Sequence, residues 1–226
     1  MEVRGLGKQI RAVLLDVDGT LLDSNDAHAA SWVEVGREFG YAIEFDEVRW
    51  LVGMGGDRVL PRLTGLSENS EQGARMLERR GEIFRQRYLP GVRTFARTHE
   101  LLQRLRADGR RLVVATSASA QDLHALLEHG GFEELIDSTT DSDQADESKP
   151  APDIVEAALR KTGESAAHVV LLGDTPYDVK AAARAGVTVI ALRCGGWTDE
   201  ELHGAAEIYQ DPAELLARYD YSLLGA

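Results

Sequence analysis

Residues 11–22 decide the fold, and they read Arg-Ala-Val-Leu-Leu-Asp-Val-Asp-Gly-Thr-Leu-Leu. An apolar run without alternation leads into Asp16, which predicts a strand buried on both faces of a parallel sheet. Asp18 follows two residues later, so extended geometry would direct both carboxylates from the same side of the chain. Gly19 then allows a tight turn. Two carboxylates this close repel each other unless a cation or a proton lies between them, so this strand end is a candidate site.

The composition is that of a soluble globular protein. The chain has 226 residues, of which 43% are hydrophobic and 28% charged, enough for one large domain or two small ones. We find no apolar stretch long enough to span a bilayer, and residues 1–9 lack the apolar middle of a signal peptide. The single cysteine, Cys194, excludes an internal disulfide and fits a reducing compartment. We therefore expect a cytoplasmic protein without a membrane partner.

The net charge limits the kinds of ligand. At −13, it argues against binding of nucleic acid through bulk electrostatics. An anionic substrate would therefore need a local positive site, supplied by a metal ion or by a placed lysine or arginine.

The order of expected elements predicts an α/β fold with a doubly wound, Rossmann-like parallel sheet. A small all-helical segment, residues 23–89, interrupts the sheet after its first strand, and Pro90-Gly91 marks the return. The expected domains are a core of 1–22 and 90–226 and a helical cap of 23–89. Strands are expected at 12–16, 111–116, 169–172, 187–192 and 207–210, with a short one beginning at Leu135-Ile136. Helices are expected at 24–40, 44–52, 68–89, 95–108, 120–130, 152–162, 176–185 and 212–219, and the glycine-rich stretch 53–56 as a loop.

Polar residues stand where three of these strands end. They are Asp16, Thr116 and Asp174. Because ligands bind outside the carboxyl ends of the strands in such sheets, we expect the three side chains to converge on one site.

Three further segments carry residues that are candidates for binding phosphate or metal. None of them, taken alone, would indicate a functional site. Thr116-Ser117 precedes a helix, where hydroxyls and free N–H groups suit a phosphoryl oxygen or simply cap the helix. Lys149 precedes a proline, which favours an extended backbone and a fixed ammonium group. Asp178, four residues after Asp174, could bind a metal or stabilise a helix N-terminus.

Taken together, these segments resemble the four motifs of the haloacid dehalogenase superfamily, in order and spacing, over residues 11 to about 195. The motifs are Asp-x-Asp-Gly-Thr from Asp16, Thr116, Lys149-Pro150 and Gly-Asp-x-x-x-Asp from Gly173. The position of the helical segment is similar to that of members with a small helical cap, including phosphoglycolate phosphatase-like enzymes and β-phosphoglucomutase.

The resemblance implies a Mg²⁺-dependent phosphomonoester hydrolase acting on a small phosphorylated metabolite. Asp16 would form an aspartyl phosphate, and Asp18 would act as acid and then base, with its pKa raised in the closed, substrate-bound state. The expected magnesium ligands are Asp16, the backbone carbonyl of Asp18 and Asp174. Asp178 would bind the ion directly or through a group that does. Thr116, Ser117 and Lys149 would hold the phosphoryl group, and Thr20 would orient Asp18.

Substrate choice is expected in the cap. His28 lies ten residues after Asp18 and resembles a cap histidine of this group, so we expect it to contact substrate or Asp18. The loop containing Gly55 and Gly56 could approach a ligand, with Arg58 pairing to a second anionic group, or could be an ordinary turn. Trp32 is expected in the core. The expected helix 68–89 carries four arginines close together, and we expect them to form a solvent-exposed face. They are Arg79, Arg80, Arg85 and Arg87.

Several alternatives remain open at this point. A phosphosugar mutase of the β-phosphoglucomutase type shares the chemistry, but Thr20 favours hydrolysis, and no match to the mutase cap lysine is evident. Asp18 argues against a dehalogenase, and the absence of lysine from 23–89 argues against a phosphonate hydrolase. A response-regulator receiver would not carry its aspartate on the first strand. A phospho-ligand-binding module without activity would be expected to lack Asp16 or Asp18. We expect a monomer or a weak homodimer.

Overall fold

The computed structural model describes residues 9–225, which form one six-stranded parallel sheet of order β3-β2-β1-β4-β5-β6. Residues 1–8 and 226, which the expected core includes, lie outside the described part. The strands are β1 (Ala12–Leu15), β2 (Arg111–Ala115), β3 (Ser138–Thr140), β4 (Val169–Gly173), β5 (Thr188–Leu192) and β6 (Glu207–Tyr209). The helices are α1 (Asn25–Phe39), α2 (Phe45–Arg49), α3 (Gly56–Thr64), α4 (Glu71–Ile83), α5 (Thr98–Ala107), α6 (Ala120–Gly130), α7 (Asp153–Thr162), α8 (Pro176–Arg184) and α9 (Pro212–Ala217). This confirms the predicted α/β class and doubly wound sheet.

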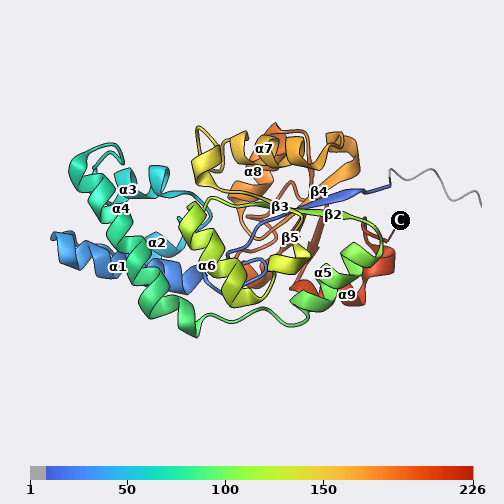
Figure 1. The fold of residues 1–226 in the computed structure, drawn as a ribbon, viewed down its shortest axis with the longest axis horizontal. Helices are drawn as coiled ribbons and strands as arrows, with labels where there is room; N and C mark the ends of the chain where they lie inside the picture. The colour runs from blue at the N-terminus through green and yellow to red at the C-terminus, as the bar shows by residue number, and fades with distance from the viewer. Residues whose placement is uncertain (1–8, 226) are drawn as a thin grey trace, which may run out of the picture.

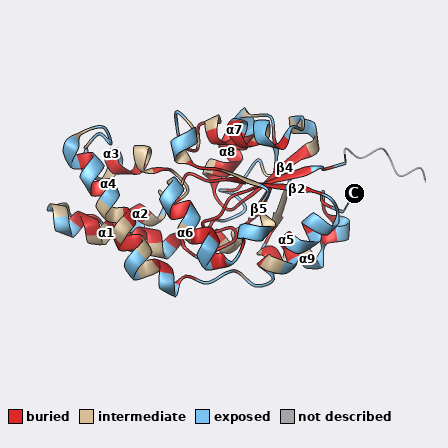
Figure 2. Cartoon of the chain, viewed as in Figure 1, coloured by how far each residue is buried: buried red, intermediate tan, exposed pale blue. Residues whose placement is uncertain are grey.

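Two apolar layers cover the sheet, one on each face (Figures 1 and 2). Helices α5, α6 and α9 pack on one face through residues such as Leu101, Leu126 and Leu215. Helices α7 and α8 pack on the other face through Ile154 and Val179. The central strands are therefore buried on both sides, which explains their continuous apolar runs.

Helices α1 to α4 gather at one end of the molecule, outside the sheet (Figure 1). We call residues 23–89, which contain them, the helical insertion. Its helices share a third apolar cluster that includes Trp32, Leu60 and Met76. Trp32 is thus a packing residue, as expected. The segment that enters the insertion and the segment that leaves it lie side by side, because Asp23 N donates to the Arg93 carbonyl at 2.9 Å.

Helix α3 was not predicted, because Gly53 to Gly56 and Pro61 argue against a helix there. Gly56 instead begins the helix, and Pro61 is accommodated within it. The buried side chains of Val59 and Leu60 pack into the cluster of the insertion. Tertiary packing therefore overrides the local propensities.

The third strand begins later than predicted. A 3₁₀ turn occupies Glu133–Leu135, and β3 starts at Ser138. Asp137 fixes this register, because its backbone N–H donates to the Leu112 carbonyl at 2.9 Å and its carboxylate accepts from Leu112 N at 2.8 Å. An edge strand of Ser-Thr-Thr carries no apolar pattern, so the sequence marks it poorly.

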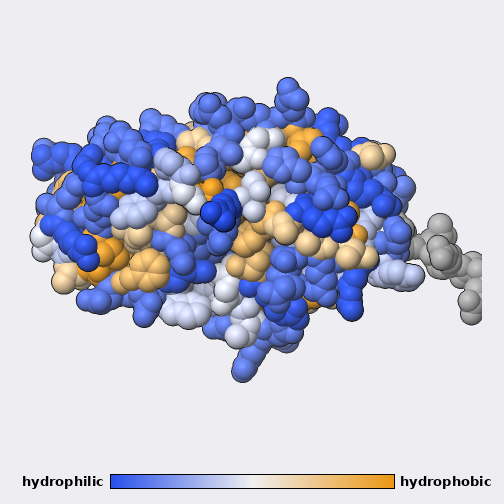
Figure 3. Space-filling model, turned by 90° about the horizontal axis from the view of Figure 1, so that it is seen from below, coloured by the Kyte–Doolittle hydropathy of each residue, from blue (hydrophilic) through white to orange (hydrophobic). Residues whose placement is uncertain are grey.

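Within residues 9–225, no helix combines the length and the apolar content that crossing a bilayer requires. The face in Figure 3 is mostly hydrophilic, with hydrophobic residues in small separate patches.

The packing of α9 can be used to test the apolar layer that α5, α6 and α9 form on one face of the sheet. Leu215 is fully buried, whereas its neighbour Leu216 is only partly buried. We expect Leu215→Ala to lower the free energy of unfolding by about 2–5 kcal/mol in urea titrations, because it leaves a cavity. Leu216→Ala is the matched control and should cost clearly less. Equal losses at the two positions would contradict the described packing.

Candidate active site

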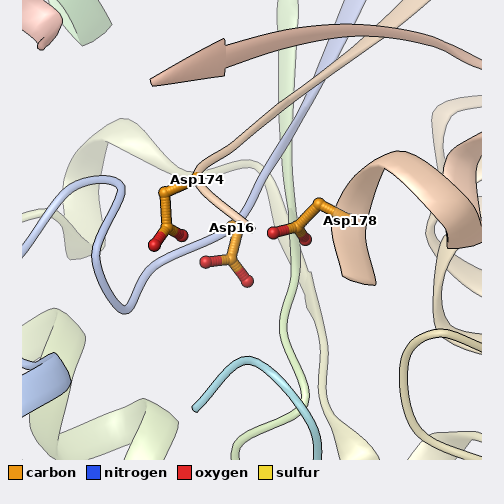
Figure 4. Close-up of side chains that lie close together, drawn as sticks. All are labelled: Asp16, Asp174 and Asp178. Carbon is orange, nitrogen blue, oxygen red and sulfur yellow. The ribbon is translucent and has the colours of Figure 1, made fainter. Parts of the chain in front are cut away.

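Three buried aspartates converge where the order of the strands reverses, between β1 and β4. Asp16 follows β1, Asp174 follows β4, and Asp178 lies in the first turn of α8. Each offers a carboxylate oxygen within 4.8 Å of those of the other two. Figure 4 shows the three side chains directed toward one another. The strand ends therefore bring together the carboxylates that the sequence singled out.

Lys149 lies fully buried against two of these carboxylates. Its Nζ donates to Asp16 Oδ1 and to Asp178 Oδ1, at 2.6 Å in each case. The other Asp178 oxygen, Oδ2, accepts from the N–H of Thr175 at 3.0 Å and from its hydroxyl at 2.6 Å. Asp178 thus caps α8 and holds the lysine at the same time.

One ammonium group does not balance three buried carboxylates. Burial raises the pKa of Asp16 to about 7, although Lys149 opposes the shift. Burial, with Asp16 and Asp178 nearby, raises the pKa of Asp174 well above its ordinary value. The pKa of Lys149 is raised, because the two carboxylates outweigh its desolvation. The cluster therefore has an unmet demand for positive charge.

Asp174 is held by Asn25, which the sequence analysis did not select, and by Thr20, which it assigned to Asp18. Asn25 Nδ2 donates to its Oδ2 at 3.1 Å and lies 3.3 Å from the Gly195 carbonyl. A side chain at Gly19 or Gly195 would collide with this carboxylate. Thr20 Oγ1 lies 3.0 Å from Asp174 Oδ1 and 3.3 Å from Asp16 Oδ2. The prediction that Thr20 orients Asp18 is therefore wrong in this structure: its hydroxyl serves the other two aspartates.

Asp18 is oriented by the first helix of the insertion. His28 Nε2 lies 2.7 Å from Asp18 Oδ1, which also accepts from the Ser24 hydroxyl. Burial alone would raise the pKa of Asp18, but His28, Ser24 and Arg80 together hold it below its ordinary value. The expected contact between His28 and Asp18 is present. The upward pKa shift expected with substrate bound stays a prediction, because this structure contains no substrate.

A chain of polar contacts links Asp18 to the far side of the cavity. Arg80 Nη2 contacts His28 Nδ1, and Arg80 Nη1 donates to Asp122 Oδ2 at 2.6 Å. Arg85 binds the second oxygen of Asp122, which is buried on α6. Phe84 stacks on the His28 ring at a centroid distance of 4.0 Å.

These contacts correct the expectation of a solvated basic face. Arg79 does lie on the surface, paired with Glu38 and Glu82, and Arg87 pairs with Glu34. Arg80 and Arg85, however, turn into the cavity. Arg80 belongs to α4, and Arg85 to the π-helical turn Phe84–Tyr88 that follows it. No sequence signal identified Asp122 as their partner.

A cavity of about 470 Å³ lies between the helical insertion and the carboxyl end of the sheet. Asp16 and Asp18 lie in its wall, with Thr116 and Ser117 beside them. Thr116 Oγ1 accepts from Ala118 N at 3.1 Å, so the turn after β2 is fixed. Lys149 N lies 3.4 Å from Ser117 Oγ. Thr116 and Ser117 therefore line the cavity with Asp16 and Asp18, whereas Lys149 lies behind them, against Ser117 and Asp16.

The glycine-rich loop lies only partly at the cavity. Gly56 lines it, but Gly55 and Arg58 do not. Gly55 N donates to Ser148 Oγ at 3.0 Å. Arg58 binds Glu147 at 2.6 Å and the Ser148 carbonyl at 3.1 Å. Arg58 therefore joins the insertion to the loop that carries Lys149, and a role in holding a second anion stays a prediction.

Comparison with known proteins agrees with this geometry. Residues 13–192 match the haloacid dehalogenase-like hydrolase family, so the chain belongs to that family. It is 28% identical over 192 residues to phosphoglycolate phosphatase of Caulobacter vibrioides, covering 83% of this chain and 81% of that protein. A hydrolase from Pseudomonas syringae has a TM-score of 0.86 at 27% identity, covering 93% of this chain and 98% of that one. CbbY from Rhodobacter sphaeroides, solved with phosphate, has a TM-score of 0.80 at 27% identity, covering 92% and 96%.

Membership confirms the resemblance found in the sequence. It also confirms the prediction of an enzyme of the phosphatase class.

The charge imbalance predicts how stability depends on pH. The pKa of Asp16 rises from 3.8 to about 7 on folding, so its stabilising effect is complete below pH 3.8 and is lost as the pH rises to about 7. We expect metal-free protein to lose stability across this interval, by about 4 kcal/mol from Asp16 alone. Urea titrations in chelator at a series of pH values measure it. Asp16→Asn should flatten the dependence, and wild-type stability that instead increases across the interval would contradict the assignment.

Proposed function

We propose that this enzyme hydrolyses the phosphomonoester of a small metabolite with the help of Mg²⁺, through an aspartyl phosphate on Asp16. The observation that carries the proposal is the buried group of three aspartates with Lys149, from which Asp16 lines a cavity together with Asp18. The family match and the relatives named as phosphatases support it.

The donor set suits a hard divalent cation. Asp16, Asp174 and Asp178 offer only oxygen, the ligand type that Mg²⁺ prefers, and their excess negative charge favours a cation. The backbone carbonyl of Asp18 is the fourth proposed ligand. When bound, Mg²⁺ would neutralise negative charge on the phosphoryl group and on the attacking carboxylate.

In the first step, an Asp16 carboxylate oxygen attacks phosphorus, and the bond from phosphorus to the ester oxygen breaks. Lys149, held against Asp16, stabilises the charge that the transferring group carries. The Thr116 hydroxyl and the N–H of Ser117 hold phosphoryl oxygens. Asp18 gives its proton to the leaving oxygen. Arrival of a phosphate dianion near Asp18 favours its protonated form, because like charges raise a carboxyl pKa.

In the second step, the Asp18 carboxylate takes a proton from water as that water attacks phosphorus. The bond from phosphorus to Asp16 breaks, orthophosphate leaves, and both aspartates return to their starting states. His28 and Ser24 hold Asp18 in place through both steps.

We further propose that residues 23–89 act as a cap that opens for substrate and closes to exclude bulk water. Hinges at 22–24 and 89–91 fit the positions where the chain leaves and rejoins the core. A cytoplasmic location and a monomer or weak homodimer remain the proposed setting.

A phosphosugar mutase is the second candidate, because it would use the same aspartates. Conversion of one sugar phosphate into its isomer without release of orthophosphate would identify the mutase. A binding module without turnover would bind such ligands without changing them.

The direct test is release of orthophosphate from a panel of small phosphate esters. Wild-type protein with Mg²⁺ should release it, and chelator should abolish the release. Asp16→Asn should lower kcat by at least about 10³-fold, because no nucleophile remains. Asp46→Asn, an exposed change in the insertion, is the matched control. Full activity of Asp16→Asn would refute the proposed chemistry.

The contacts of Asp122 predict a second effect on turnover. Asp122→Asn removes the charged partner of Arg80 and Arg85, so the support behind His28 and Asp18 should loosen. We expect kcat/KM to fall by roughly 10²-fold, as for other small misplacements of reacting groups. Glu128→Gln, exposed on the same helix, should leave the rate unchanged. Equal activity of the two variants would show that Asp122 has no positioning role.

A further inference from the structure

The charged side chains that line the cavity are mostly acidic. Apart from Asp16 and Asp18, the charged lining within the described residues consists of two arginines and six carboxylates. The arginines are Arg80 and Arg85. The carboxylates are Asp57, Glu68, Glu78, Asp122, Asp143 and Asp146. They come from the helical insertion and from the core, and Glu68, Glu78, Asp143 and Asp146 are exposed to solvent.

Neither arginine offers a free charge to a ligand. Asp122 binds both guanidinium groups and is itself buried, so the contacts are shielded from water. Arg80 also contacts His28. Arg58, the cation expected to hold a second anion, lies outside the cavity lining and binds Glu147 instead.

The other carboxylates keep most of their charge uncompensated. Among residues 9–225, we find no ion pair for Glu68, Glu78, Asp143 or Asp146. Asp57 has a distant one, 3.9 Å from Arg58, and its Oδ1 is buried without a hydrogen-bond partner. Burial and, to a lesser extent, the nearby Asp57 raise the pKa of Glu68.

We propose that the enzyme selects phosphomonoesters whose non-phosphate part donates hydrogen bonds and carries no second negative charge, such as a sugar or amino-sugar monophosphate. This rests on the proposed phosphatase function. Carboxylates accept hydrogen bonds from hydroxyl and ammonium groups and repel carboxylates and phosphates. A cavity of about 470 Å³ has room for a ligand of this size.

The test compares substrates of one size and different charge. Glucose 6-phosphate, glucosamine 6-phosphate and 6-phosphogluconate have a neutral, a cationic and an anionic remainder. We expect kcat/KM for each of the first two to exceed that for the third by at least about tenfold. Glu68→Gln/Glu78→Gln should reduce this ratio at least about threefold, because two repelling charges are removed. Glu71→Gln, exposed on α4 but outside the cavity lining, should leave the ratio unchanged.

Binding separates this inference from the proposed function. Titration calorimetry of Asp16→Asn with the same three compounds and Mg²⁺ should give the same order of affinity. That order without hydrolysis by wild-type protein would support the charge selection and refute the phosphatase. Hydrolysis with a preference for 6-phosphogluconate, or a ratio unaffected by the double substitution, would overturn the charge selection and leave the phosphatase standing.

Discussion

The site depends on one buried ammonium group placed among three buried carboxylates. Lys149 satisfies Asp16 and Asp178 directly, and Asp174 is left to the neutral groups of Thr20 and Asn25. Such an arrangement disfavours a fully ionised cluster without further positive charge, which is why the pKa values of Asp16 and Asp174 rise. The negative charge of these three carboxylates exceeds the charge of the one ammonium group, so a site of this kind favours the binding of a cation.

The helical insertion completes the site from the opposite side. His28 and Ser24 come from the start of α1 and fix Asp18, whereas Arg80 joins His28 to Asp122 on the core. The proposed acid and base is therefore supported by groups on both sides of the cavity. If the insertion closes as proposed, its movement would change this support together with the access of water.

Much of this arrangement could be predicted from the sequence, because strand ends in a doubly wound sheet converge whatever lies between them. The apolar run before Asp16 and the Gly173-Asp174 ending of β4 therefore predicted that Asp16 and Asp174 lie close together, as they do. The contacts between the insertion and the core are not marked by any comparable sequence pattern. The pairing of Arg80 with Asp122 joins the insertion to α6 of the core, residues far apart in the sequence. The hydroxyl of Thr20 contacts Asp174 and Asp16 rather than the expected Asp18. Helix α3 was missed because packing outweighed its glycine and proline.

Covalent capture of the proposed intermediate tests the central claim most directly. Protein turning over a hydrolysed ester is quenched in acid, reduced with borohydride and digested, and the peptide that contains Asp16 is examined by mass spectrometry. An aspartyl phosphate is reduced to homoserine, so we predict homoserine at position 16, dependent on both substrate and Mg²⁺. Unmodified Asp16 under conditions of rapid turnover, or homoserine at another aspartate, would contradict the assignment of Asp16 as the nucleophile.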